Sequence, residues 1–82
     1  ILVAPTHINE KSPNLLDSFF GTAKASQSFS FSYKKISDDL NLQFLDASKY
    51  VRTNEIDGLH WDEYQHANFA KAVFEKIKSL SI

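Results

Sequence analysis

The chain has 82 residues, no cysteine, a formal net charge of -1 and a hydrophobic content of 43%. This composition predicts a globular chain and excludes disulfides and thiolate-bound zinc as sources of stability. The near-neutral charge gives no reason to expect binding to nucleic acid or to an anionic membrane surface. No apolar run approaches the roughly 20 residues that a membrane span needs.

The first predicted element is a strand at Ile1–Ala4, which is continuously apolar and ends at Pro5. A short apolar run without alternation is typical of a strand covered on both faces, as in a parallel sheet. Residues 6–14 are polar and predict a loop. An apolar patch at residues 15–20, closed by Gly21, predicts a short helical turn.

Residues 22–41 carry two competing patterns. The segment 28–33 alternates with the period of a strand, but the longer stretch has no internal Gly or Pro and also fits a helix. We therefore predict a helix, which leaves Phe31 the least well explained. The apolar side chains that share one helical face are Phe29, Tyr33, Ile36 and Leu40.

A second strand is predicted at residues 42–47, followed by a polar loop at 48–56 and a last helix that begins at Asp62. Asp62 and Gln65 have the spacing of a capping box, in which side chains satisfy the free N–H groups of the first turn. The apolar stripe of this helix is expected to comprise Ala70, Val73, Phe74, Ile77 and Leu80.

The order strand, helix, strand, loop, helix predicts two parallel strands. Two parallel strands alone make a poor sheet, so we expect further strands in a missing N-terminal segment, in a partner chain or in a second copy. The lack of methionine and the strand-like opening favour a missing N-terminal segment. The visible portion has no signal peptide, which favours a cytoplasmic location without establishing it.

The segment with the clearest chemical meaning is the tetrapeptide from Asp57 to His60, in a loop just before the last helix. A histidine that acts as a general base needs a carboxylate on its other ring nitrogen. Gly58 gives the backbone the freedom to fold the carboxylate of Asp57 back onto the ring. The alternative interpretation is an aspartate that caps a turn beside a surface histidine.

These blocks together resemble the SGNH hydrolases, the GDSL-type lipase and esterase superfamily. Asp57-Gly58-Leu59-His60 resembles the last D-x-x-H block, and Ile1–Pro5 resembles a late strand ending in Ala-Pro. A crossover helix, a strand ending like Phe44-Leu45-Asp46-Ala47 and a closing helix like Asp62–His66 complete the same order. The resemblance covers essentially the whole chain.

The resemblance implies an α/β chain: residues 1–82 would be the C-terminal βαβα portion of one flavodoxin-like, three-layer α/β/α domain with a parallel sheet. It implies that His60 is the general base toward a serine hydroxyl and that Asp57 is its orienting carboxylate. The implied reaction is hydrolysis of a small ester through an acyl-enzyme, with no cofactor and no metal.

The main departure from the family is the missing nucleophile. The Gly-Asp-Ser-like block and the Gly and Asn that complete the oxyanion hole have no counterpart here. We therefore expect the isolated chain to be inactive, and we expect its partner to be the N-terminal segment of the same hydrolase or a second copy. The serines without a matching context are Ser12, Ser18, Ser26, Ser28, Ser30, Ser32, Ser37, Ser48, Ser79 and Ser81.

Two alternatives remain open at this point. The chain could be a non-catalytic α/β module that associates with itself, in which case the aromatic set would form part of the interface and not only core. It could also be a small metal-binding domain that uses His60 and His66. The aromatic residues in question are Phe19, Phe20, Phe29, Phe31 and Tyr33.

Several other polar residues have simpler interpretations. We expect His66 to be structural and Trp61 to pack at the entry of the last helix. His7 and Asn9 follow the first strand, where active-site loops emerge in open α/β sheets, and are candidates for substrate contact or for solvation alone. Asp46, at the end of the second strand, fits a structural or capping role.

Overall fold

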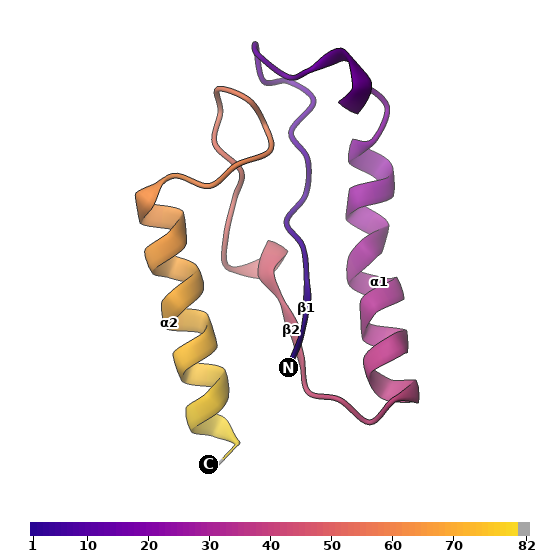
Figure 1. The fold of residues 1–82 in the computed structure, drawn as a ribbon, viewed down its shortest axis with the longest axis vertical. Helices are drawn as coiled ribbons and strands as arrows, with labels where there is room; N and C mark the ends of the chain where they lie inside the picture. The colour runs from indigo at the N-terminus through magenta and orange to yellow at the C-terminus, as the bar shows by residue number, and fades with distance from the viewer. Residues whose placement is uncertain (81–82) are drawn as a thin grey trace.

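The computed structural model of the protein describes residues 1–80. Its two strands and two helices alternate along the chain, with two short 3-10 turns between them (Figure 1). The predicted order is therefore confirmed, although each strand has only three residues. The elements are β1 (Leu2–Ala4), η1 (Asp17–Phe19), α1 (Ala23–Asp39), β2 (Phe44–Asp46), η2 (Ala47–Lys49) and α2 (Glu63–Ser79).

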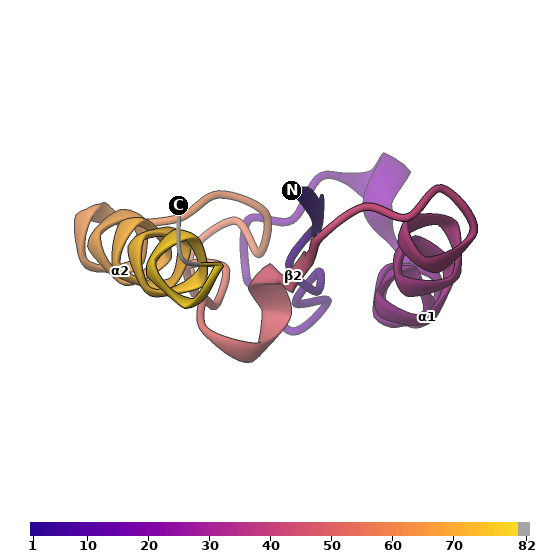
Figure 2. The same ribbon diagram turned by 90° about the horizontal axis from the view of Figure 1, so that it is seen from below.

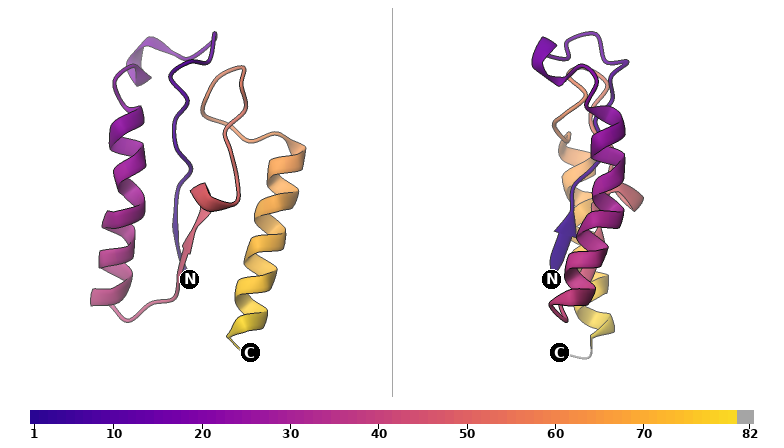
Figure 3. Two further views of the ribbon diagram at one scale, coloured as in Figure 1. Left: turned by 180° about the vertical axis from the view of Figure 1, so that it is seen from behind. Right: turned by 90° about the vertical axis from the view of Figure 1, so that its right-hand side faces the viewer.

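The two strands pair in parallel, as predicted, with Leu2 opposite Phe44 and Ala4 opposite Asp46. The two helices lie on opposite sides of the strand pair, so each face of the small sheet has a helix next to it (Figure 2). Within residues 1–80 neither outer edge of the sheet is paired, and the molecule is flat, with extents of 43 × 28 × 13 Å. The C-terminal ends of both strands point to the same end of the molecule (Figure 3).

The face of α1 that meets the strands is lined by small hydroxyl side chains. Ser26 and Ser37 are 2% and 0% exposed, and their hydroxyls donate to the carbonyls of Ala23 and Lys34 at 2.6 and 2.8 Å. The Ser26 hydroxyl also accepts from the backbone N–H of Ile8, at 2.9 Å. Because the hydroxyls are satisfied by the preceding helical turn, they are buried at little cost and keep the helix close to the sheet.

This packing corrects the predicted inner face of the helix. Of the four apolar residues assigned to it, only Tyr33 is half-buried, while Phe29, Ile36 and Leu40 are exposed to 38, 47 and 64%. The serines have the same helical spacing as the apolar set, and they occupy the position nearest the strands because their small volume permits a close approach. Core packing was also expected for Phe20 and Phe31, but these are 57 and 77% exposed.

Three of the exposed apolar residues of α1, Phe29, Ile36 and Leu40, lie on one flank of the helix. On the β2 side, the Ser30 hydroxyl lies 3.4 Å from that of Ser48, and the Lys34 ammonium lies 5.9 Å from the centre of the Phe44 ring. Helical spacing places Phe29 and Ile36 on the other side of the inner face from Lys34. The apolar flank of α1 therefore lies on the β1 side of the sheet.

The start of α2 follows the capping prediction only in part. The Asp62 carboxylate accepts from the backbone N–H of Gln65, at 2.9 Å, as predicted. The Gln65 side chain does not complete a reciprocal box. Its amide oxygen instead accepts from the backbone N–H of Arg52, at 2.9 Å, which ties the first turn of α2 to the segment after η2.

The predicted apolar stripe of α2 is likewise only partly covered. Val73 and Leu80 are half-buried, but Phe74 and Ile77 are 61 and 42% exposed. The one buried residue of this helix is Ala72. Two strands of three residues offer too little surface to cover a helix of 17 residues, so Phe74 and Ile77 stay exposed within the described part of the chain.

Candidate active site

Asp57 and His60 form a direct contact in the loop between η2 and α2. The Nδ1 atom of His60 lies 2.6 Å from the Oδ2 atom of Asp57. The other carboxylate oxygen, Oδ1, accepts from the backbone N–H groups of Leu59 and His60 at 2.9 and 3.0 Å. The tetrapeptide therefore folds back on itself in the way its sequence predicts.

This contact fixes the tautomer of the neutral imidazole ring. An ionised carboxylate has only acceptor atoms, so Nδ1 must carry the hydrogen, and in the neutral ring Nε2 then has a free lone pair. The side chain of His60 is 78% exposed, against 31% for Asp57. The Nε2 atom is thus open to a proton donor that approaches from outside residues 1–80. Within that range no hydrogen bond joins a serine hydroxyl to the His60 ring.

The loop is held in place by the segment that follows β1. The carbonyls of Gly58 and Ile56 accept from the backbone N–H groups of Asn9 and Asn14, at 3.1 and 2.9 Å. Gly58 has a φ of +73°, in the left-handed region that favours glycine. These contacts join two segments that are distant in sequence, and the loop between η2 and α2 lies beyond the C-terminal ends of the strands (Figure 1).

The surroundings of Asp57 favour its ionised form. The backbone N–H groups of Leu59 and His60, followed by the His60 ring, lower the pKa of its carboxyl from the ordinary 3.8 to about 2. Hydrogen bonds donated to a carboxylate stabilise its ionised form relative to the neutral acid, and this lowers the pKa. At neutral pH this carboxylate is therefore a fixed negative charge beside the imidazole.

The structure of Est24, a carbohydrate acetylesterase from Sinorhizobium meliloti, is similar to this one, with a TM-score of 0.80 and 26% sequence identity. The match covers 95% of this chain and 37% of Est24, so this chain spans little more than a third of that enzyme's length. No family model and no curated protein matches the sequence. The likeness supports the resemblance at the level of the superfamily. That residues 1–82 form the C-terminal part of one domain stays a prediction.

Titration of Asp57 gives a direct check of the site geometry. We expect its carboxyl carbon, followed by NMR, to titrate at about 2 and not at 3.8. A depressed pKa stabilises the folded state above pH 3.8, and that contribution is lost as the pH falls through about 2. In a His60→Ala variant the pKa should stay below 3.8, because the two backbone donors remain. An Asp57 that titrates at 3.8 in the parent protein would contradict the fold-back of the turn.

Trp61 and His66 pack against each other at the start of α2. The Trp61 indole N–H donates to the Thr6 hydroxyl at 3.0 Å, and its ring centre lies 5.3 and 5.0 Å from those of His66 and Phe69. Trp61 thus packs at the entry of α2, as predicted. Residues 1–80 contain no group of three or more His, Cys, Asp or Glu side chains placed to hold a metal ion.

Asp46 caps η2 and is not part of the pair. Its carboxylate accepts from the backbone N–H and the hydroxyl of Ser48, at 3.0 and 2.6 Å. Burial raises the pKa of Asp46, but the hydrogen bonds from Ser48 and Ser30, with the charge of Lys49, outweigh burial and lower it overall. The structure therefore supports the capping role expected from its position at a strand end.

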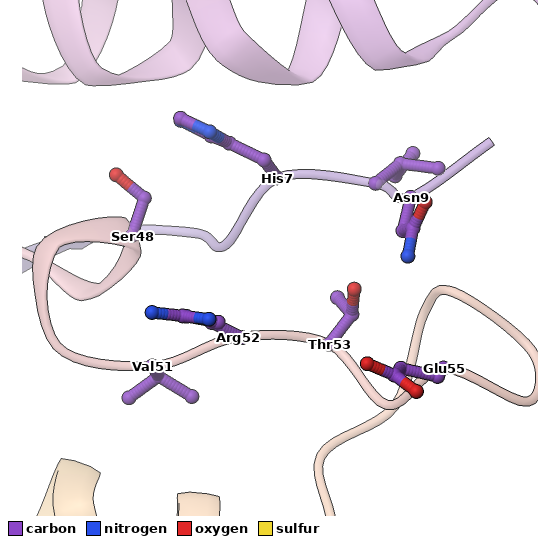
Figure 4. Close-up of a pocket in the computed structure, with 8 residues that line it drawn as sticks. His7, Asn9, Ser48, Val51, Arg52, Thr53 and Glu55 are labelled. Carbon is purple, nitrogen blue, oxygen red and sulfur yellow. The ribbon is translucent and has the colours of Figure 1, made fainter. Parts of the chain in front are cut away.

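A cavity of about 370 Å³ opens between the segment after β1 and the segment after η2. Figure 4 shows His7 and Asn9 on one wall and Arg52 and Thr53 on the other. The sequence singled out His7 and Asn9 but not Arg52 or Glu55, which gave no motif signal. The catalytic candidates Asp57 and His60 do not line this cavity.

None of the helices in the described part of the chain is both long enough and apolar enough to cross a membrane.

Proposed function

We propose that the chain supplies the acid–base part of an SGNH-type serine esterase, with His60 as general base and Asp57 as its orienting carboxylate. The observation that carries the proposal is the 2.6 Å contact between Nδ1 of His60 and Oδ2 of Asp57, with Nε2 left open. The likeness to a carbohydrate acetylesterase over 95% of the chain supports the same reaction class.

In this proposal Nε2 of His60 accepts the proton of a serine hydroxyl as its oxygen attacks the ester carbonyl. The charge that forms on the ring is stabilised by Asp57 through Nδ1–H. His60 then returns the proton to the departing alkoxide, which leaves as the alcohol. Water, activated by the same nitrogen, hydrolyses the acyl-enzyme. The serine and the oxyanion donors come from a segment outside this sequence.

The proposed partner is the N-terminal segment of the same hydrolase, added beside β1. Phe29, Ile36 and Leu40 leave an exposed apolar flank on that side of α1, and the outer edge of β1 is unpaired within residues 1–80. A further parallel strand would pair this edge and cover the flank. A second copy that binds the same surface is the alternative, and would make the chain a self-associating module.

The polar lining of the cavity between the segments after β1 and after η2 favours a polar substrate. Imidazole, amide, guanidinium and carboxylate groups from His7, Asn9, Arg52 and Glu55 line it and offer both donors and acceptors. Sugar hydroxyls need both kinds of partner. We therefore propose an acetylated carbohydrate as the substrate class, as the name of Est24 states for that enzyme.

A chimera tests the proposal: this chain replaces the matching part of Est24, and hydrolysis of p-nitrophenyl acetate is followed. We expect the chimera to be active, the isolated chain to show no turnover sensitive to a serine-directed inhibitor, and His60→Ala to lower kcat of the chimera by about 10³-fold or more. His66→Ala is the matched control and should keep most of the activity. Inhibitor-sensitive turnover by the isolated chain, or an active His60→Ala chimera, would contradict the proposal.

The size of the isolated chain in solution distinguishes the two partners. A monomer across the accessible concentration range favours the N-terminal segment as the partner. A dimer that forms with rising concentration, and is lost when Ile36 is replaced by Lys, favours the second copy.

A further inference from the structure

Asn54 uses both its side chain and its backbone at the start of the loop that carries the Asp57–His60 pair. Its side-chain oxygen accepts from the backbone N–H groups of Ile56 and Asp57, each at 2.9 Å. Its backbone N–H donates to the carbonyl of His60 at 2.7 Å, and its carbonyl accepts from Gly58 at 3.1 Å. Asn54 therefore binds the beginning, the middle and the end of the loop.

Asp57 repeats the geometry of the Asn54 side chain three residues later. Each side chain accepts from the backbone N–H groups two and three positions ahead of it, which for Asp57 are Leu59 and His60. The two turns are thus linked in series, because the second N–H held by Asn54 belongs to Asp57 itself. The first turn sets the backbone of Asp57, and the second turn sets the backbone of His60.

We propose that Asn54 is a positioning residue for the Asp57–His60 pair. The catalytic meaning of this role rests on the proposed function, but the positioning itself does not. Without the side-chain oxygen, the N–H of Asp57 loses its partner and the residue is free to rotate away from the ring. The backbone contact between Asn54 and His60 is available to any residue, so the side chain alone is the element under test.

A purely local role for Asn54 makes a different prediction. If its turn only closed the loop, its removal would lower stability and leave the contact between Asp57 and His60 unchanged. If it positions the pair, its removal must change the surroundings of the Asp57 carboxyl. The pKa of Asp57 separates these two cases, because it reports the surroundings of the carboxyl in the folded protein. The exchange rate of the His60 Nδ1 proton is a second local report, because the His60 side chain is 78% exposed and its ring proton can exchange without unfolding of the chain.

The experiment compares the parent 82-residue chain with Asn54→Ala and Asn54→Ser, using NMR of the Asp57 carboxyl and the His60 ring proton. We expect Asn54→Ala to raise the pKa of Asp57 from about 2 toward 3.8 and to speed exchange of the ring proton. Asn54→Ser retains a side-chain oxygen that can accept in the same turn, and it should recover most of the parent behaviour. An unchanged pKa in Asn54→Ala overturns the proposal.

A control variant and a replacement variant complete the experiment. Asn14→Ala removes an amide side chain from the neighbouring loop but keeps the backbone N–H that donates to Ile56, so the Asp57 pKa should not change. If Asn54→Ala loses the helical circular dichroism signal, Asn54→Gln replaces it, since the longer side chain moves the amide oxygen away from its two donors. The same rise is expected, and its absence overturns the proposal. No measurement uses catalysis, so the result stands whether or not the chimera is active.

Discussion

Replacement of Gly58 by alanine is expected to reduce the free energy of unfolding by roughly 2–4 kcal/mol. A φ of +73° strains any residue that has a Cβ atom. A Cβ at this position would also lie 2.3 Å from the carbonyl oxygen of Asn9 and 2.9 Å from the Ser12 hydroxyl oxygen. Because the closest atom belongs to the backbone, the two loops must move apart, and the hydrogen bond from Asn9 to Gly58 is lost with the movement.

Gly21 is a matched control for this prediction. It has a φ of +85°, but a Cβ there would meet no atom within 4 Å. Gly21→Ala should therefore cost only the backbone strain, roughly 1–2 kcal/mol. The measurement is urea unfolding of both variants, and the difference between them reports the contact between the loops. Equal losses would show that the loop of residues 9–14 does not restrain the turn.

The order of elements could be predicted because local signals mark it. Pro5 ends the first strand, Gly21 precedes α1 with a positive φ, and Asp62 caps α2. Each of these effects acts within a few residues and does not depend on tertiary contacts. The parallel pairing then follows from a helix that connects two strands.

The inner face of α1 could not be predicted from hydrophobic periodicity. That rule assumes that the most apolar face packs against the sheet, whereas here Ser26 and Ser37 are buried and Leu40 is 64% exposed. Serine is buried at little cost when its hydroxyl bonds to its own helix, and this depends on the distance between helix and sheet. The apolar flank has a different role from the inner face, and we propose that it meets a further strand.

The candidate site likewise has one part that the sequence predicts and another that it does not. The contact between Asp57 and His60 spans three residues and could be predicted from their spacing, with Gly58 between them. The restraint on this turn from Asn9 and Asn14 is made by backbone groups more than 40 residues away in sequence, and these carry no side-chain signal. The cavity residue Arg52 was missed for the same reason, since its place depends on how two loops meet.

In the chimera with Est24, we expect Asp57→Asn to lower kcat by about 10³–10⁴-fold with little change in KM. The asparagine oxygen can still accept from the backbone N–H groups of Leu59 and His60, so the turn should keep its shape. Its amide N–H₂ then faces Nδ1 of His60 and makes that nitrogen an acceptor. The ring hydrogen moves to Nε2, which can no longer take the proton of a serine hydroxyl.

Asp38→Asn is the control for a loss of one negative charge. Asp38 forms an exposed ion pair with Lys34 at 2.6 Å on the surface of α1, and pairs of this kind contribute little to stability. Steady-state kinetics of the two chimeras, each checked for an unchanged circular dichroism spectrum, measure the specific effect of Asp57. A drop confined to Asp57→Asn supports the orienting role, because the two variants change net charge equally but only Asp57 contacts a ring nitrogen of His60. Similar kcat values for both variants would reduce Asp57 to a turn-capping residue and leave His60 without an orienting partner in this chain.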